Sequence, residues 1–411
     1  MQGPVGRLIA LAAALVALAA PGLVPDPAPA QPRPEARAWV LVDAGDGEVL
    51  AAREANDRTA IASTTKLMTA YVARWELDLD EIVVAPGYDG APVESLLGLM
   101  EGERMRVRDM LAGLLLASGN DAAVALAEAA ADSVPEFVAE MNRAARRLGL
   151  DGTSFANPIG LDEAGNHSTP ADLAALAIEL REDRFLSRVV DSTRIRLRTG
   201  ADRRPVVNRN TLVAEVPWVD GVKTGRTADA GYVLVGSASR KGIELVSVVV
   251  GAPSEDDRDA ATLDLLRYGF SLYSREEIVG RWDRYAAANL DYRDDRLPLL
   301  AARSVSLTLR EDEEVDVRVE APREVSGPVG RGDRLGELTV LVDREPVGRV
   351  PLVAARGASA ATALDRIDSA LPGPRAVVWA LALGAAFLAL GGILLIHRRR
   401  SGGGRLASGA P

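Results

Sequence analysis

Residues 63–70 read Ser-Thr-Thr-Lys-Leu-Met-Thr-Ala, and the lysine at position 66 is the feature of this stretch that needs an explanation. The chain has 48 lysine and arginine residues, yet only three of them are lysines: Lys66, Lys223 and Lys241. Arginine keeps its charge in proteins, whereas a buried lysine can lose its proton and act as a base. The use of arginine almost everywhere else therefore indicates a chemical role for Lys66.

Ser63 and Lys66 are three residues apart in a helix expected over 63–76, so their side chains share one face. A serine in the first turn lies near the positive end of the helix, which favours a developing alkoxide. A lysine that is desolvated or close to another cation is neutral enough to accept the serine proton. The spacing alone is weak evidence, because the frequencies of serine and lysine in this chain produce such a pair by chance fairly often.

The composition excludes several classes of protein. With 411 residues, 48% of them hydrophobic, the chain is long enough for two domains with cores of their own. A net charge of −10, without a basic stripe interleaved with aromatic residues, argues against nucleic-acid binding. The absence of cysteine excludes disulfides, thiol catalysis and Cys-ligated zinc. Only His167 and His397 are present, so a multi-histidine metal site cannot be built, and we expect no metal and no cofactor.

The first 30 residues have the pattern of a signal peptide. Arg7 precedes an apolar run over 8–20, and Ala28-Pro29-Ala30 then provides a small-x-small cleavage site. An uncleaved N-terminal anchor is the alternative, but the run is short for crossing a bilayer. We therefore expect the rest of the chain to be exported.

Residues 375–397 are predicted to form a transmembrane helix. Its apolar stretch, at about 1.5 Å per residue, is long enough to cross the roughly 30 Å hydrocarbon core of a bilayer. Three arginines follow at 398–400, which by the positive-inside rule leaves the tail, 398–411, in the cytoplasm. The expected location is the cell membrane, with a single span and an extracytoplasmic catalytic domain.

Between the two ends the hydrophobic period changes twice. The first region, 31–275, combines an early hairpin at 38–51 and later strands from 231 with helices at 63–76, 106–117, 121–131, 135–148, 170–181 and 256–273. Helices that lie between early and late strands predict an α+β domain, an antiparallel sheet with helices packed on it. The region 276–357 reads as a small all-β domain, and 358–374 as a linker rich in Ala, Gly and Pro.

Two further short motifs accompany the serine–lysine pair. Ser118-Gly119-Asn120 lies between two expected helices, and its simplest interpretation is an N-cap with a turn glycine. Lys223-Thr224-Gly225 precedes the strand that starts at Gly231 and could be a surface turn. Ser-x-x-Lys, Ser-x-Asn and Lys-Thr-Gly together, in this order, resemble the motif set of penicillin-binding proteins and class A β-lactamases.

The sequence resembles the low-molecular-mass penicillin-binding proteins that are D-alanyl-D-alanine carboxypeptidases, peptidase family S11. The likeness spans nearly the whole ectodomain. It runs through Val42-Asp43…Gly47, Ile61–Tyr71, Ser118–Ala122, Asn157-Pro…Gly160-Leu-Asp, Ser168-Thr169, Asn208-Arg-Asn, Asp220–Gly225, Thr227, Ala230-Gly-Tyr and 303–354. The resemblance implies a serine β-lactamase/DD-peptidase-like catalytic domain, followed by the family's C-terminal β domain.

The resemblance also implies a role for each motif residue. Ser63 would be the acylated nucleophile and Lys66 its general base. Ser118 would relay a proton toward the leaving group, and Asn120 would orient Lys66 and the substrate amide. Lys223 would add positive charge to the site.

The remaining residues would bind the substrate. Thr224 and Gly225 would help hold it, and the backbone N–H groups of Ser63 and Arg226 would bind the oxyanion. Arg209, in Asn-Arg-Asn, would attract the substrate carboxylate. Arg226 stands where some relatives have His, a departure that could tune rate or drug affinity.

We therefore expect a membrane-tethered hydrolase of cell-wall synthesis, with a part in cell shape. It would remove the terminal D-Ala from peptidoglycan pentapeptides through an acyl-enzyme, and it would bind β-lactam antibiotics covalently. A DD-endopeptidase on the same scaffold is an alternative, because cleavage of a cross-link uses the same site. A class A β-lactamase is disfavoured by Gly119, the β domain and the C-terminal anchor. A catalytically weak peptidoglycan-binding scaffold protein is the last alternative.

Overall fold

The computed structural model describes residues 30–370 and 375–401. The chain divides into two compact units, the first ending at Leu272 and the second beginning at Tyr273. The sequence places the same division three residues later, after 275. The expected signal peptide lies outside the described residues apart from residue 30, and so does the tail beyond residue 401.

A five-stranded antiparallel sheet forms the centre of the first unit. Its strand order is β2-β1-β9-β8-β7. The bounds are β1 Ala38–Asp43, β2 Val49–Arg53, β7 Val219–Thr227, β8 Gly231–Arg240 and β9 Ile243–Ala252. β1 of the early hairpin pairs with β9, the last strand of the unit, so strands from the beginning and the end of the unit lie in one sheet.

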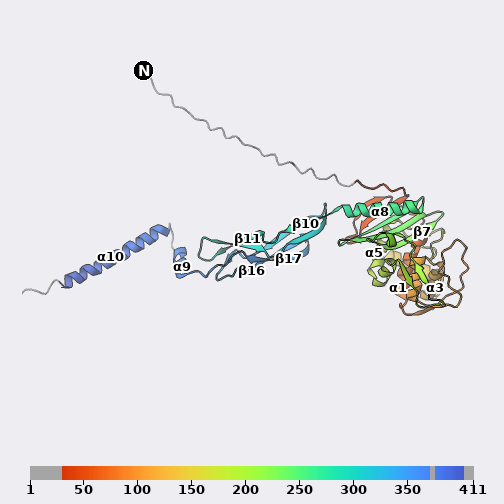
Figure 1. Cartoon of the computed structure of the whole chain (residues 1–411), viewed down its shortest axis with the longest axis horizontal. Coiled ribbons are helices and arrows are strands. Elements are labelled where there is room, and N and C mark those ends of the chain that lie inside the picture. Colours follow the sequence, from red (N-terminus) through yellow and green to blue (C-terminus); the bar gives the residue numbers. More distant parts are fainter. Residues whose placement is uncertain (1–29, 371–374, 402–411) are drawn as a thin grey trace, which may run out of the picture. The chain divides into compact units, whose positions relative to one another are not determined.

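Helices cover both faces of this sheet, which explains why its central strands are almost continuously apolar. Val40 and Val42 belong to the same buried cluster as α5, Pro170–Glu182, whereas Leu41 points the other way and lies against α8, Glu255–Ser271. Figure 1 shows α5 and α8 on either side of the strands.

The helices expected in the first unit are present, whereas two short helices, Arg184–Val190 and Leu212–Glu215, were not anticipated from the sequence. Thr169 caps α5 by accepting a hydrogen bond from the Asp172 N–H at 3.1 Å, and Ser254 caps α8 in the same way. The expected helix 106–117 is a short α-helix that continues as a π-helix. The bounds are α1 Lys66–Glu76, α2 Val107–Ala112, π-helix Gly113–Ala117, α3 Asn120–Ala130, α4 Val134–Arg147, α6 Arg184–Val190 and α7 Leu212–Glu215.

Two short hairpins in this unit were not anticipated from the sequence. They are β3 Ile82–Val84 with β4 Arg104–Arg106, and β5 Arg194–Arg196 with β6 Pro205–Val207. Three of these three-residue strands bury only their central side chain, and β5 only partly buries Ile195, so they leave almost no period-2 pattern in the sequence.

The second unit is an all-β module whose core is entirely apolar within its main cluster. A six-stranded sheet has the order β14-β16-β17-β12-β11-β15, and β10 pairs with β13 in a separate two-stranded sheet. The bounds are β10 Tyr273–Val279, β11 Arg284–Leu290, β12 Arg296–Ala301, β13 Val305–Arg310, β14 Val315–Glu320, β15 Glu324–Val325, β16 Arg334–Val342 and β17 Glu345–Ala354.

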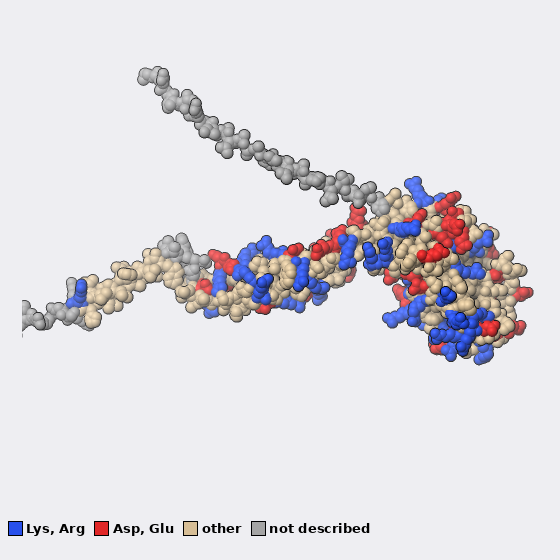
Figure 2. Space-filling view, in the orientation of Figure 1, with Lys and Arg blue, Asp and Glu red and all other residues tan. Residues whose placement is uncertain are grey.

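Two helices follow the second sheet. The first is α9, Ala363–Ala370, within the stretch predicted as a linker, and Asp365 accepts a hydrogen bond from Arg293 of the β module at 2.9 Å. The second is α10, Arg375–Ser401. Its segment Trp379–Arg398 is long and apolar enough to cross a membrane, and Figure 2 shows its surface free of charged side chains over most of its length. The α+β fold with an all-β domain and one apolar C-terminal helix is thus confirmed.

Candidate active site

The nucleophile candidate Ser63 lies in a single 3-10 turn, Ala62–Thr65, that leads directly into α1. Ser63 is partly exposed, whereas both of its neighbours are buried. Ala62 has a φ of 50°, in the left-handed region that non-glycine residues rarely adopt. A Cβ on Gly160 would lie 2.1 Å from the Ala62 carbonyl oxygen, so only glycine lets this backbone pack behind the serine. Gly160 therefore packs against the buried side of this turn, and the Ser63 hydroxyl stays accessible.

Lys66 is fully buried beneath that serine. Its Nζ lies 3.0 Å from Ser63 Oγ and 2.5 Å from the carbonyl oxygen of Ile159. Burial lowers the pKa of Lys66 from 10.5 to about 7; the positive charge of Arg209 also lowers it, and Glu94 and Asp121 oppose the shift. Near neutral pH the amine is therefore deprotonated in a substantial fraction of molecules and can accept the serine proton.

Ser118 and Asn120 reach the site from the junction between the π-helix and α3. Ser118 has a left-handed φ of 63° and is 3% exposed, and its Oγ has no hydrogen-bond partner among the described residues. A buried hydroxyl without a partner is costly and calls for an explanation, such as a bound substrate group. The Asn120 amide donates to Glu94 Oε2 at 2.6 Å, and no hydrogen bond to Lys66 is found within residues 30–370.

The Lys-Thr-Gly stretch lies in β7, the edge strand that faces the serine turn, and not in a surface turn before the strand at Gly231. A Cβ on Gly225 would lie 3.0 Å from the Ser63 nitrogen, so glycine allows strand and turn to approach closely. Lys223 is 1% exposed and donates to the Thr224 carbonyl at 2.8 Å. Burial lowers its pKa well below the usual value, an effect that opposes the positive charge expected of it.

Two depressions meet at Ser63. The larger, about 540 Å³, is lined by Glu94, Asn120 and Gly160 among others. The smaller, about 230 Å³, is lined by Ser118, Thr224, Gly225, Arg209, Arg226 and Arg258 together with Tyr232 and Glu255. The arginines are thus concentrated around the smaller depression.

The arginines of the smaller depression are held by different means. Arg209 Nε donates to the Ala117 carbonyl at 2.9 Å. The Arg226 guanidinium lies 4.9 Å from the centre of the Tyr232 ring. Arg258, on α8, is buried and forms ion pairs with Glu255 and Asp259 at 2.9 and 2.7 Å. Arg258 is thus already paired, and Arg209 and Arg226 are the residues that make this depression suited to an anionic group.

The structure brings the nine residues singled out in the sequence to one place, but sequence reasoning missed Glu94 and Arg258. Arg258 left a signal: it occupies the same face of its helix as the buried Ala261, Thr262 and Leu265, where a charge is unusual. Glu94 left none, because it lies in a long loop without a motif. No group of three or more potential metal ligands occurs among the described residues.

Known proteins match both units. Residues 26–254 match the family model of D-alanyl-D-alanine carboxypeptidases, peptidase S11, and residues 270–358 match the C-terminal domain of penicillin-binding protein 5. D-alanyl-D-alanine carboxypeptidase DacF of Bacillus subtilis is 34% identical over 330 residues, which cover 78% of this chain and 85% of DacF.

Solved structures agree. Penicillin-binding protein 5 from Haemophilus influenzae has a TM-score of 0.58 at 27% identity, covering 80% of this chain and 99% of its own. The Streptomyces K15 DD-transpeptidase has a TM-score of 0.56 at 32% identity, covering 59% of this chain and all of its own. With the motif residues assembled as described, the chain belongs to the D-alanyl-D-alanine carboxypeptidase family of serine peptidases, S11.

Proposed function

We propose that this chain is a serine D-Ala-D-Ala carboxypeptidase of the cell wall, with Ser63 as its nucleophile and Lys66 as the base. One observation carries the proposal: Lys66 Nζ lies 3.0 Å from Ser63 Oγ, and burial lowers the pKa of this lysine to about 7. A hydroxyl within hydrogen-bond reach of a neutral amine is the arrangement that general-base catalysis needs at physiological pH.

The reaction proceeds in two steps. Lys66 takes the hydroxyl proton as Ser63 Oγ attacks the carbonyl carbon of the penultimate D-Ala. The C–N bond then breaks, and the leaving amine of the terminal D-Ala receives a proton through Ser118, whose buried Oγ has no other partner among the described residues. Water attacks the resulting ester, which releases the shortened peptide and restores the serine. A β-lactam would acylate the same serine, and its ring-opened ester would persist.

The smaller depression supports a carboxypeptidase rather than an endopeptidase. Its volume of about 230 Å³ suits one small residue, and the arginines on its wall would pair with a free terminal carboxylate. A cross-linked peptide would have to place a much larger group there. Arg209 and Thr224 are the residues we assign to the carboxylate, and the backbone N–H groups of Ser63 and Arg226 are those we assign to the oxyanion.

Incubation of the purified protein with a peptide ending in D-Ala-D-Ala, followed by mass spectrometry, tests this function. Loss of one alanine is the expected result. Cleavage of cross-linked dimers alone would mean an endopeptidase instead. No change in either substrate would leave only a binding or scaffolding role.

We also propose that the enzyme is exported and tethered by α10, with a single span and the catalytic unit outside the cytoplasm. The apolar segment Trp379–Arg398 and the arginines that follow it support this topology. Removal of the chain from Pro374 onward should release an active protein into the extracytoplasmic space. A truncated protein that stays in the membrane would instead indicate an uncleaved N-terminal anchor.

A further inference from the structure

The loop between β3 and β4, residues 85–103, forms part of the wall of the larger depression and is firmly anchored to α3. The buried carboxylate of Asp121 accepts backbone N–H groups of Leu97, Gly98 and Leu99 at 2.8, 2.7 and 2.8 Å. In return, the Asn120 N–H donates to the Ser95 carbonyl at 2.8 Å. The loop and the start of α3 therefore form one hydrogen-bonded block.

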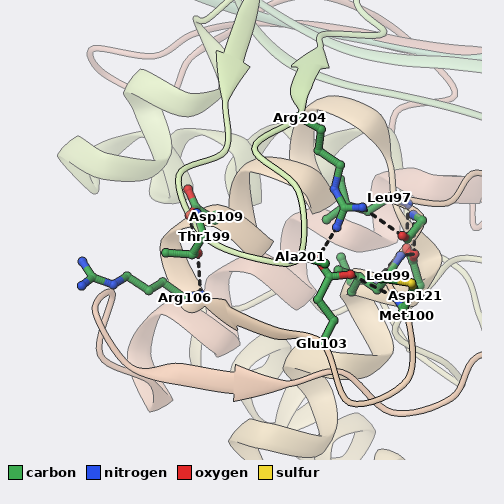
Figure 3. Close-up of polar contacts among 12 residues, drawn as sticks. Leu97, Leu99, Met100, Glu103, Arg106, Asp109, Asp121, Thr199, Ala201 and Arg204 are labelled. Atoms are coloured by element: carbon green, nitrogen blue, oxygen red, sulfur yellow. Dashed lines mark hydrogen bonds and ion pairs between the residues drawn. The ribbon is translucent and has the colours of Figure 1, made fainter.

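A second buried carboxylate, Glu103, fixes the same half of the loop where it enters β4. Glu103 accepts from Arg204 at 2.6 Å, from the Ala201 N–H at 2.9 Å and from the Met100 N–H at 3.1 Å. Figure 3 shows these contacts beside those of Asp121. These anchors and the bond to the Ser95 carbonyl follow Glu94 directly in the chain, so a side chain at position 94 has a defined position with respect to the catalytic serine.

Glu94 is that side chain, and both of its carboxylate oxygens accept hydrogen bonds. Its Oε2 accepts from the Tyr88 hydroxyl and from Asn120 Nδ2, the latter at 2.6 Å, while its Oε1 accepts from the Ala91 N–H at 3.0 Å. We propose, on the basis of the function assigned above, that Glu94 is a positioning residue for acylation. It holds the Asn120 amide in one orientation and places a fixed negative charge on one side of the cleft.

The orientation follows from hydrogen-bond chemistry. A carboxylate can only accept, so the part of the Asn120 amide that faces Glu94 must be its NH₂ group. The Asn120 carbonyl oxygen then lies on the other side of the amide, where no described residue donates to it. That oxygen is available to an N–H of the substrate or to Lys66 when the substrate enters. Without Glu94 the Asn120 amide could rotate by about 180° and direct its NH₂ group, instead of its oxygen, toward the substrate.

The negative charge acts on the base. Lys66 is faced by Glu94 from the loop and Asp121 from α3, and by two basic groups, Arg209 and Lys223 of β7. Of these, Glu94 has the largest effect that opposes burial, and it raises the pKa of Lys66. Burial raises the pKa of Glu94 itself, but its hydrogen bonds from Tyr88, Asn120 and Ala91 outweigh this and lower it, so the carboxylate stays ionised at neutral pH.

Two substitutions separate these effects. Glu94→Gln keeps an oxygen for Asn120 and removes the charge, whereas Glu94→Ala removes both. Since acylation needs neutral Lys66, the loss of the charge should move the acid limb of the rate–pH profile to lower pH by about half a unit to one unit. At high pH, where Lys66 is neutral in all variants, Glu94→Ala should acylate about tenfold more slowly than Glu94→Gln.

The measurement is the rate of acylation of the full chain by a fluorescent penicillin between pH 5 and 9, about two units on each side of the Lys66 pKa. Glu101→Gln is the matched control: it removes an exposed carboxylate of the same loop and should leave the profile unchanged. An acid limb that does not move in Glu94→Gln, or equal high-pH rates for Glu94→Gln and Glu94→Ala, overturns the proposal. If Glu94→Ala does not fold, the position of the acid limb in Glu94→Gln decides alone. A wild-type chain that is never acylated would refute the proposed function instead.

Discussion

The two units of the chain differ most clearly in the polar groups that they bury. The first unit buries two lysines, an arginine and several carboxylates, including Lys66, Lys223, Arg258 and Asp121. Among the described residues of the second unit, Arg310 is the one buried polar or charged residue. Burial of a charged group is unfavourable unless partners compensate it, so a unit selected for stability alone would avoid it. The contrast agrees with the location of the candidate active site in the first unit, and we expect a structural role for the second.

The largest effect should come from the nucleophile. Ser63→Ala removes the hydroxyl that we propose as the nucleophile, and the other hydroxyl residues of its turn, Thr64 and Thr65, are buried. We expect covalent labelling by a fluorescent penicillin to disappear in a gel assay, while circular dichroism stays unchanged. Labelling that persists in the folded variant would show that another residue is acylated.

The next effect concerns Lys66. Arginine keeps the positive charge but cannot act as a base, and general-base assistance is typically worth about 10²–10⁴-fold in rate. Lys66→Arg should therefore lower the acylation rate by about this factor. In the wild type the rate should rise with pH through about 7, because burial lowers the pKa of Lys66 to that value and the neutral amine is the active form. A variant within a few-fold of wild type would remove Lys66 from its role.

Lys223→Arg should have an intermediate effect. From the sequence alone, a charge-conserving exchange at this position should be mild. The structure changes that expectation, because the side chain is 1% exposed and a larger guanidinium has to fit in its place. We expect acylation to slow by about tenfold and the melting temperature to fall by several degrees, as overpacking usually destabilises by about 1–3 kcal/mol. An unchanged melting temperature would mean that the cavity is more adaptable than its burial suggests.

Lys223 also shows which features of the site could be predicted from the sequence and which could not. The serine–lysine pair and the Ser118 turn are predicted from local patterns, and the family resemblance groups them with Lys223-Thr224-Gly225, but the strand β7 that carries this last motif was not predicted. The burial of Lys223 and the contacts of Glu94 were not predicted. They depend on the approach of a strand to a turn at Gly225 and on backbone contacts to Asp121, which no local pattern reports.

A core substitution in the second unit tests whether that unit contributes stability but not chemistry. Leu338 is fully buried in β16, and Leu338→Ala should lower the unfolding free energy of that unit by about 2–5 kcal/mol. The acylation rate should stay at the wild-type value below the melting transition, since the site lies in the first unit. Leu126→Ala, in the core of the first unit, is the matched control and should lower both stability and labelling on warming. Calorimetry combined with labelling would distinguish the Leu338→Ala variant from the Leu126→Ala variant. Slower acylation by folded Leu338→Ala would contradict a purely structural role for the second unit.

The smallest effect should come from Lys241, the third lysine of the chain. It lies exposed in the turn between β8 and β9, with a left-handed φ of 54°, next to Gly242. Lysine and arginine have similar backbone requirements, and an exposed side chain makes neither a packing nor a base contribution here. Lys241→Arg should therefore leave both the acylation rate and the melting temperature unchanged within error. Measured beside Lys66→Arg and Lys223→Arg, it separates the two buried lysines from the exposed one. A slow Lys241→Arg enzyme would mean that burial is not what distinguishes them, and the chemical interpretation of the rare lysines would lose its basis.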